Sequence, residues 1–525
     1  MEIIVKYSGD FEQFISGLED IGVFRPVDLG QGFAVLDISA DMISVLEALP
    51  LVEDIELPKS VFLNNSVTPP VSCPGLPDFR RSLYSGAGVL VGIIDTGVDY
   101  TNREFLLPDG RTRIAAIWDQ SAQGTPPPGF FEGAEYSREK IDSALLSADP
   151  FSVIPRTDIS GHGTAVAGIA AGNTTGAAYA SELIVVRVRS ASGEDEKTTQ
   201  LMKALRYVIT KAAQLQKPAA INISYGMNQG SHRGDSLFES YISAVSREWK
   251  TTIVIPTGNE GGAGHHYEGR LSNGEELDIG FFTAKGIDSF YLSMWKNYTD
   301  IISAELFLPD GKSTGVINRY TTNTNAVADG LSVTSVFGQP SARSVFQEIF
   351  YDIRPAGGTI PQALWTLRLR AESIVDGHFD IWLPTIEQVT ADTYFTDPGD
   401  TLTMTIPSTA AGIIRVAGFD SRTGAAAAFS GRGTRCPGEV LPDVSAPAVN
   451  VAAPSLSGGF DSLSGTSFAS PAVTGYAAQL MQWGIVCGNS KFMYGERVKA
   501  ELRLAAQRSR DINYPDPSLG YGRIF

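Results

Sequence analysis

Short apolar runs alternate with helical patterns through the first half of this 525-residue chain. Residues 89–94 are continuously apolar, which is typical of a parallel strand buried on both faces. Similar runs occupy residues 183–188, 219–223 and 252–255, and helical stretches occupy residues 198–215 and 236–250. Strands that alternate with helices predict an α/β fold with a doubly wound parallel sheet. In such a fold the reactive side chains lie beyond the carboxyl ends of the strands.

Three glycine-rich segments each hold one reactive side chain. They are VGIIDTGVD with Asp95, SGHGTAVAG with His162 and LSGTSFASPAVTG with Ser467. A carboxylate, an imidazole and a hydroxyl are the groups that acyl transfer through a serine ester requires. Pro471 is tolerated only near the start of a helix, so Ser467 is expected at a helix N-terminus, where free N–H groups favour an oxyanion. The three segments therefore predict a catalytic triad.

All three segments resemble the signatures of the subtilase (S8) serine endopeptidases, whose triad has the same order along the chain. The resemblance implies that Asp95, rather than the nearby Asp99, orients His162, which activates Ser467. It also implies that Asn259, in the segment IPTGNEGG, donates to the oxyanion together with the backbone N–H of Ser467. The chain departs from the family at residue 448, where alanine replaces a usual glycine.

The family resemblance also implies two backbone edges that flank a bound substrate strand. One edge contains Ser224, Tyr225 and Gly226, and the opposite edge contains Arg189 and Ser190. Such edges bind mainly the peptide backbone, so they predict no preference for the side chain before the cleaved bond.

No metal and no cofactor is predicted. Cys73, Cys436 and Cys487 form no CxxC pair, and no loop has the spacing of an EF-hand. His265 and His266 have no neighbouring carboxylates at the spacing of a metal site, so they are expected to be loop residues.

Residues 1–65 are predicted to form a small α+β unit of βαββαβ order. Its position before the catalytic segments resembles the subtilase propeptide, an intramolecular chaperone and inhibitor; the alternative is an unrelated accessory domain. Residues 58–75 are rich in Pro, Ser and Asn and predict a linker. The resemblance to a propeptide implies that this linker runs through the active-site cleft and that the chain cuts itself between about Phe62 and Val67. The predicted cleavage region is Leu63, Asn64, Asn65 and Ser66.

Alternating and aromatic short runs replace the helical pattern from about residue 266 and predict an inserted β-sandwich or jelly-roll-like domain. The peptidase pattern resumes afterwards and includes the serine segment. The predicted domains are a propeptide at 1–65, a subtilisin-like catalytic domain at 66–265 and 405–525, and an inserted domain at 266–404.

The absence of a leader, the short propeptide and the β-rich insert make the chain similar to the Csp germination proteases of clostridial spore formers. The segment DYTNREF…GRTRIAAIWDQS and the ending YPDPSLGYG support this resemblance. It implies a protein partner, the zymogen of a spore cortex hydrolase, activated by limited proteolysis. Two alternatives remain open: a non-catalytic regulator blocked by its own propeptide, and a broad intracellular subtilase.

The formal net charge of -17 argues against a nucleic-acid partner, because phosphate binding needs concentrated Lys and Arg. No basic segment followed by an apolar one begins the chain, and no apolar run approaches the ~20 residues of a membrane helix. We therefore expect a protein that is not exported by the Sec pathway, is not inserted in a membrane, and is cytoplasmic or spore-associated.

Overall fold

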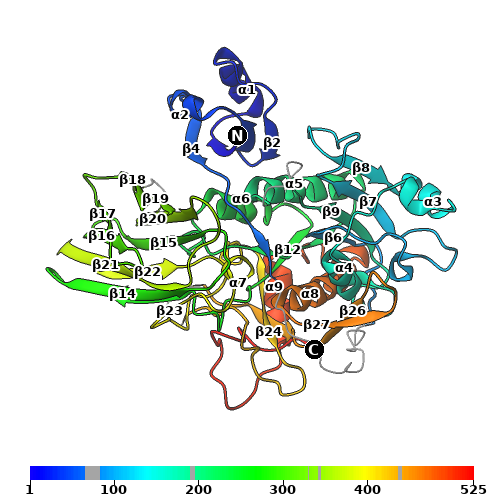
Figure 1. Cartoon of the computed structure of the whole chain (residues 1–525). Helices are drawn as coiled ribbons and strands as arrows, with labels where there is room; N and C mark the ends of the chain where they lie inside the picture. The colour runs from blue at the N-terminus through cyan, green and yellow to red at the C-terminus, as the bar shows by residue number, and fades with distance from the viewer. Residues whose placement is uncertain (65–82, 190–195, 329, 341–343, 435–439) are drawn as a thin grey trace.

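An eight-stranded sheet forms the centre of the molecule (Figure 1). The computed structural model describes residues 1–64, 83–189, 196–328, 330–340, 344–434 and 440–525. The strand order is β25-β24-β12-β10-β6-β9-β7-β8, and every neighbouring pair is parallel except β7 with β8. The strands are β6 (Leu90–Asp95), β7 (Ile114–Asp119), β8 (Ala134–Ser137), β9 (Glu182–Arg187), β10 (Ala219–Ile223), β12 (Thr251–Pro256), β24 (Ile414–Phe419) and β25 (Val444–Pro447). The predicted doubly wound parallel sheet is confirmed.

Helices cover both faces of this sheet and enclose two apolar cores. One core contains α4 (His162–Ala171), α8 (Thr466–Met481) and α9 (Glu496–Ala505). The other contains α5 (Thr198–Gln214) and α6 (Leu237–Val245). Since apolar side chains meet helices on both sides, β6 and β12 are buried along their whole length, as their continuous apolar sequence predicts.

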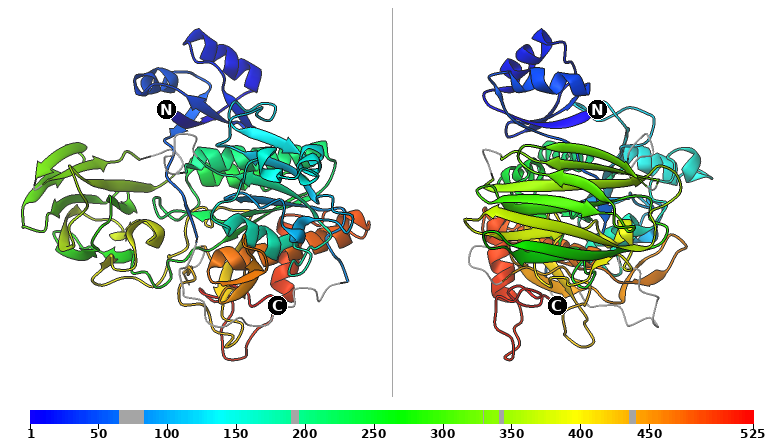
Figure 2. Two further views of the ribbon diagram at one scale, coloured as in Figure 1. Left: turned by 45° about the vertical axis from the view of Figure 1, so that its right-hand side comes forward. Right: turned by 60° about the vertical axis from the view of Figure 1, so that its left-hand side comes forward.

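The N-terminal unit has a four-stranded sheet of order β2-β3-β1-β4 and lies over α5 and α6 (Figures 1 and 2). Its apolar residues continue the core around those helices, and the Phe33 ring meets Tyr241 edge-on at 5.5 Å. Lys203 adds an ion pair of 2.7 Å with Glu2. The elements are β1 (Glu2–Tyr7), α1 (Phe11–Asp20), β2 (Val27–Gly30), β3 (Phe33–Asp37), α2 (Ile43–Glu47) and β4 (Val52–Glu56).

The chain between β12 and β24 forms a β-sandwich beside the central sheet (Figure 2). Its sheets have the orders β13-β22-β15-β20-β19-β18 and β17-β16-β21-β14-β23, and a shared apolar core lies between them. The strands are β13 (His266–Arg270), β14 (Glu276–Thr283), β15 (Phe290–Asn297), β16 (Ile301–Phe307), β17 (Ser313–Ile317), β18 (Asn323–Ala328), β19 (Leu331–Phe337), β20 (Phe346–Pro355), β21 (Ala363–Ser373), β22 (His378–Trp382) and β23 (Tyr394–Phe395).

The expectation that His265 and His266 are loop residues holds for His265, which precedes β13, and is wrong for His266, which begins that strand. Both side chains are buried because they lie where the sandwich joins the catalytic part. The ring of His266 stacks on Trp382 at 4.9 Å and its Nε2 lies 3.0 Å from the Asp380 carboxylate.

The remaining α-helices and β-strands of the described residues are short. They are β5 (Phe62–Leu63), α3 (Arg138–Leu145), β11 (Tyr225–Gly226), α7 (Ile386–Val389), β26 (Val451–Pro454) and β27 (Phe460–Leu463). Within the described ranges, no helix is both long enough and apolar enough to cross a bilayer.

Candidate active site

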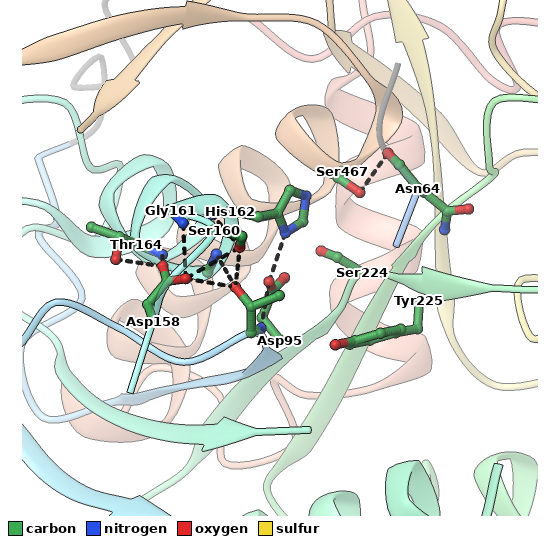
Figure 3. A network of polar contacts seen from close by, with 12 residues as sticks. Asn64, Asp95, Asp158, Ser160, Gly161, His162, Thr164, Ser224, Tyr225 and Ser467 are labelled. Carbon is green, nitrogen blue, oxygen red and sulfur yellow. Dashed lines mark hydrogen bonds and ion pairs between the residues drawn. The ribbon is translucent and has the colours of Figure 1, made fainter. Parts of the chain in front are cut away.

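Asp95 is the last residue of the central strand β6 and is fully buried. Its Oδ1 accepts a hydrogen bond of 2.7 Å from the backbone N–H of Thr96 and lies 2.6 Å from Nδ1 of His162 (Figure 3). A carboxylate in this position fixes the imidazole tautomer that carries its proton on Nδ1. Nε2 is then left as the basic atom.

His162 is the first residue of α4, and a buried carboxylate holds the start of that helix. Asp158 accepts from the backbone N–H of Gly161 at 2.9 Å and of Thr164 at 2.8 Å. Gly163 packs directly on the Asp95 loop, since a Cβ there would lie 2.2 Å from the carbonyl oxygen of Gly97. Capping and close packing together place the imidazole against Asp95. Sequence analysis missed Asp158, although an Asp shortly before a helix start is a recognisable capping signal.

Ser467 is the second residue of α8 and is fully buried, which confirms the expected place at a helix N-terminus. Gly465 precedes the helix with φ 145°, a backbone conformation that favours glycine. Ser470, one turn along α8, donates a hydrogen bond of 2.7 Å to Asn222 of β10, so the serine helix is tied to the central sheet. Asn222 in turn donates to Ser224 Oγ at 2.8 Å.

The hydroxyl of Ser467 donates a hydrogen bond of 2.8 Å to the backbone carbonyl of Asn64 (Figure 3). Within the described residues, Nε2 of His162 has no hydrogen-bond partner. Figure 3 shows the imidazole between Asp95 and Ser467. The three groups thus meet at one place, with the serine hydroxyl directed at a peptide carbonyl rather than at the imidazole.

The segment that ends at Asn64 is bound as an added strand. β5 pairs antiparallel with β11, with Leu63 opposite Tyr225, and the N–H of Asn64 donates to Ser224 O at 3.1 Å. On its other side Val61 donates to the carbonyl of Glu196 at 2.8 Å. An extended segment between two backbone edges is how strand addition binds a peptide.

The side chain of Asn64 is 2 % exposed and lies against Gly226 and Thr405. A Cβ on Gly226 would come within 2.8 Å of Asn64 Oδ1 and 2.6 Å of Thr405 Oγ1, so only glycine leaves this space open. Gly258 has φ 85°, and a Cβ added there would lie 2.4 Å from the same Thr405 hydroxyl oxygen. Thr405 follows the inserted domain, and no local pattern predicts it as part of the site.

Asn259 follows β12 and is held to the serine helix. Its Oδ1 accepts from the backbone N–H of Thr466 at 3.0 Å and from the Thr466 hydroxyl at 3.1 Å. Its Nδ2 is buried, makes no hydrogen bond of good geometry within the described part of the chain, and interacts with the nearby Glu387 carboxyl. With its oxygen held by Thr466, the side chain keeps its N–H₂ group available as a donor, as stabilisation of an oxyanion requires.

Two acidic side chains beside Asn259 were not singled out by sequence analysis. Glu260 is 3 % exposed and takes part in three hydrogen bonds with other parts of the site. Burial and the neighbouring charge of Glu260 raise the pKa of the Glu387 carboxyl to about 8. Glu387 lies in α7, far from the catalytic segments along the chain.

The remaining predicted residues have different outcomes. Ser224, Tyr225 and Gly226 line the bound segment, whereas Arg189 is exposed. Ser190, Asn65 and Ser66 lie outside the described residues. Among the residues that the structure describes, no three His, Cys, Asp or Glu side chains are gathered so that they could hold a metal ion.

Comparisons with known proteins identify the family of the chain. A family model described as "Subtilase family" matches residues 86–296 and 391–522, and one described as "Csp protease B prodomain" matches residues 1–59. The solved CspB protease of Clostridium perfringens is 36% identical, with a TM-score of 0.78 over 86% of this chain and 94% of that chain. An epidermin leader peptide processing serine protease (EpiP) of Staphylococcus aureus is 14% identical with a TM-score of 0.51, over 100% of this chain and 97% of that chain, and shares the fold.

Two curated relatives match shorter regions. Subtilisin-like protease 3 of Pseudogymnoascus destructans is 31% identical over 189 residues, which are 36% of this chain and 36% of that protein. Subtilisin-like protease 9 of Arthroderma benhamiae is 23% identical over 264 residues, 50% of this chain and 52% of that protein. The chain therefore spans 36% and 52% of the length of these two relatives. The predicted resemblance is confirmed: this chain belongs to the subtilase family and has a Csp-type prodomain.

Proposed function

We propose that this chain is a serine endopeptidase that first cleaves its own prodomain at the bond between Asn64 and Asn65. One observation carries the proposal: the Ser467 hydroxyl lies 2.8 Å from the carbonyl oxygen of Asn64, at the end of a segment bound as an added strand. The nucleophile therefore lies against the peptide group that it would attack.

The reaction follows from the groups around that carbonyl. Ser467 Oγ attacks the carbonyl carbon while His162 Nε2 takes the hydroxyl proton, and Asp95 stabilises the imidazolium. Asn259 Nδ2 and the backbone N–H of Ser467 donate to the oxyanion. His162 then gives the proton to the leaving amine of Asn65, and water releases the acyl group from Ser467. The prodomain ends at Asn64 and the new N-terminus is Asn65.

Intact mass spectrometry with N-terminal sequencing of the purified chain tests this step. We expect two fragments that separate between Asn64 and Asn65 in the wild type, and one uncut chain in Ser467→Ala. The loss is expected to be on the order of 10⁶-fold, as for a subtilisin nucleophile. Ser421→Ala, at an exposed position, is the matched control and should be cut normally. Cleavage of Ser467→Ala at the normal rate would disprove self-cleavage.

The further substrate that we propose is the zymogen of a spore cortex hydrolase, cut once during germination. The Csp-type prodomain and the 36% identity to the CspB protease support this proposal, as does the narrow seat around Asn64. This function would place the protein in the spore. Incubation of the purified protein with a cortex-hydrolase zymogen should give one discrete cut. Digestion of unrelated unfolded proteins at many sites would instead favour a broad subtilase.

A non-catalytic regulator is the second candidate, because the prodomain segment fills the site and the Ser467 hydroxyl is bound to Asn64. A serine-directed phosphonate probe separates the two candidates. We expect covalent labelling of the wild type at Ser467 once the chain has been cut. A chain that stays uncut and unlabelled under every condition would favour the regulator.

A further inference from the structure

The carboxylate of Glu260 has three hydrogen-bond partners around the oxyanion residue Asn259. Its Oε1 accepts from the backbone N–H of Ile386 at 2.9 Å. Its Oε2 accepts from Asn228 Nδ2 at 3.1 Å and lies 2.5 Å from Nδ1 of His265. Both oxygens are thereby used inside the protein, and Glu260 is buried although it directly follows a residue of the catalytic site.

The partners of Glu260 come from the segment after β11 and from the two junctions with the inserted domain. Asn228 follows the backbone edge that pairs with β5, and it also donates to the carbonyl of Leu383 at 3.0 Å. His265 lies where the chain enters the inserted domain, and Ile386 begins α7 where the chain returns from it. Since α7 also contacts β5, the inserted domain reaches the bound segment from this side.

The side chains of His265 and Glu260 form a buried pair. Nε2 of His265 lies 2.9 Å from the carbonyl oxygen of Thr393, so Nε2 must carry a hydrogen. Nδ1 lies 2.5 Å from a carboxylate oxygen of Glu260, so both ring nitrogens of His265 have hydrogen-bond partners. A hydrogen bond to an ionised carboxylate is stronger than one between neutral groups.

Asn259 is consequently held from two directions. Thr466 fixes its side-chain oxygen, and the bonded neighbour Glu260 fixes its backbone to the inserted domain. An oxyanion donor acts only when it is held in place before the reaction, and a displacement of about 1 Å can remove much of its effect.

We infer that the inserted domain is part of the catalytic apparatus: through Ile386, and through His265 at the junction that leads into it, this domain holds Glu260, and Glu260 positions the oxyanion amide of Asn259. Glu260 and His265 are positioning residues that touch no substrate atom. The inference rests on the proposed endopeptidase function and adds a role for the inserted domain in that same site.

A double-mutant cycle on the first-order rate of self-cleavage tests this inference. Freshly refolded protein is sampled over time, and cleavage after Asn64 is followed by mass spectrometry. We expect Glu260→Gln to slow cleavage about tenfold or more, a size usual for coupled neighbouring residues, because an amide cannot accept at both of its ends. In the Asn259→Ala background the same change should have an effect of about twofold or less, since the group that it positions is already absent.

A matched control is Glu239→Gln. Glu239 is a fully buried glutamate in the first turn of α6. Its carboxylate accepts hydrogen bonds from the hydroxyls of Ser236 and of the distant Thr409. Its substitution should leave the rate of cleavage within about twofold in both backgrounds, because it contacts none of the residues around Asn259. Thermal unfolding of each variant in a Ser467→Ala background shows whether it has folded.

His265→Gln is a second variant. Its amide N–H₂ can reach only one of the two present partners of His265, the Glu260 carboxylate or the Thr393 carbonyl. We expect this variant also to slow cleavage in the wild-type background and to have little effect in the Asn259→Ala background. Equal slowing by Glu260→Gln in both backgrounds would overturn the inference, since it would mean a general structural effect. A wild-type chain that is never cut would instead overturn the proposed function.

Discussion

The hydroxyl of Ser467 and the backbone carbonyl of Asn64 are joined by a hydrogen bond of 2.8 Å across 403 positions of sequence. Asn64, the last described residue after the N-terminal unit, therefore lies in the catalytic site. The strand pairing of β5 with β11 holds it there. A segment of the chain itself therefore occupies the catalytic site, and in the proposed function this segment is also the first substrate.

Replacement of Asp95 by asparagine should slow self-cleavage on the order of 10⁴-fold, since the wrong imidazole tautomer then faces Ser467. Asp99→Asn is the control, because its Oδ1 accepts from Thr101 and an asparagine oxygen can do the same. The measurement is the fraction of cut chain against time. Similar losses in both variants would contradict the assignment of the triad carboxylate.

Gly226→Ala should slow cleavage after Asn64 by about tenfold or more, because small displacements of the reacting group are costly. The added Cβ would lie 2.8 Å from Asn64 Oδ1 and 2.6 Å from Thr405 Oγ1. The control is Gly357→Ala, where no heavy atom lies within 4 Å of the new Cβ. Shortening the bound side chain by Asn64→Gly in the Gly226→Ala background should restore part of the rate. Unchanged cleavage of Gly226→Ala would show that Asn64 does not occupy this space during the reaction.

Loss of the cap at the start of α4 should both destabilise the protein and slow cleavage. Asp158→Ala removes the acceptor for the N–H groups of Gly161 and Thr164, which typically costs about 1–2 kcal/mol. Urea unfolding in a Ser467→Ala background measures the free energy. Asp149→Ala removes an exposed cap far from His162 and should leave cleavage unchanged. Equal behaviour of the two variants would contradict a role for Asp158 in placing His162.

Glu387 should make the protein less stable as the pH rises. The folded state keeps the Glu387 proton up to a pKa of about 8, whereas the unfolded state releases it near 4.5. Between these values the folded state binds more protons, so the free energy of unfolding decreases as pH increases. Glu387→Gln removes this contribution. Urea unfolding in the Ser467→Ala background should show a stability gain for Glu387→Gln that grows from pH 5 to pH 8 and then stays constant. Parallel stability curves would contradict the raised pKa.

Local patterns of sequence predict the central fold and the reactive groups well. A continuously apolar run must be buried on both faces, so residues 89–94 form a central strand and Asp95 lies at its carboxyl end. Small residues after His162 and Ser467 likewise predict buried helices that begin beside those side chains. The apolar runs and the periodicity that indicate burial are contained in short segments, so they can be recognised from the sequence alone.

The binding of Asn64 beside Gly226 and the hydrogen bonds of Glu260 depend on contacts between residues that lie far apart in the sequence. Glu260 meets Ile386 across 126 positions, and the linker composition alone could not say which residue of the region would reach Ser467. His265 follows no pattern of a buried residue, yet the junction with the inserted domain encloses it. Such pairings depend on how complete domains pack together, because the free energy that selects them comes from surfaces buried between distant parts of the chain.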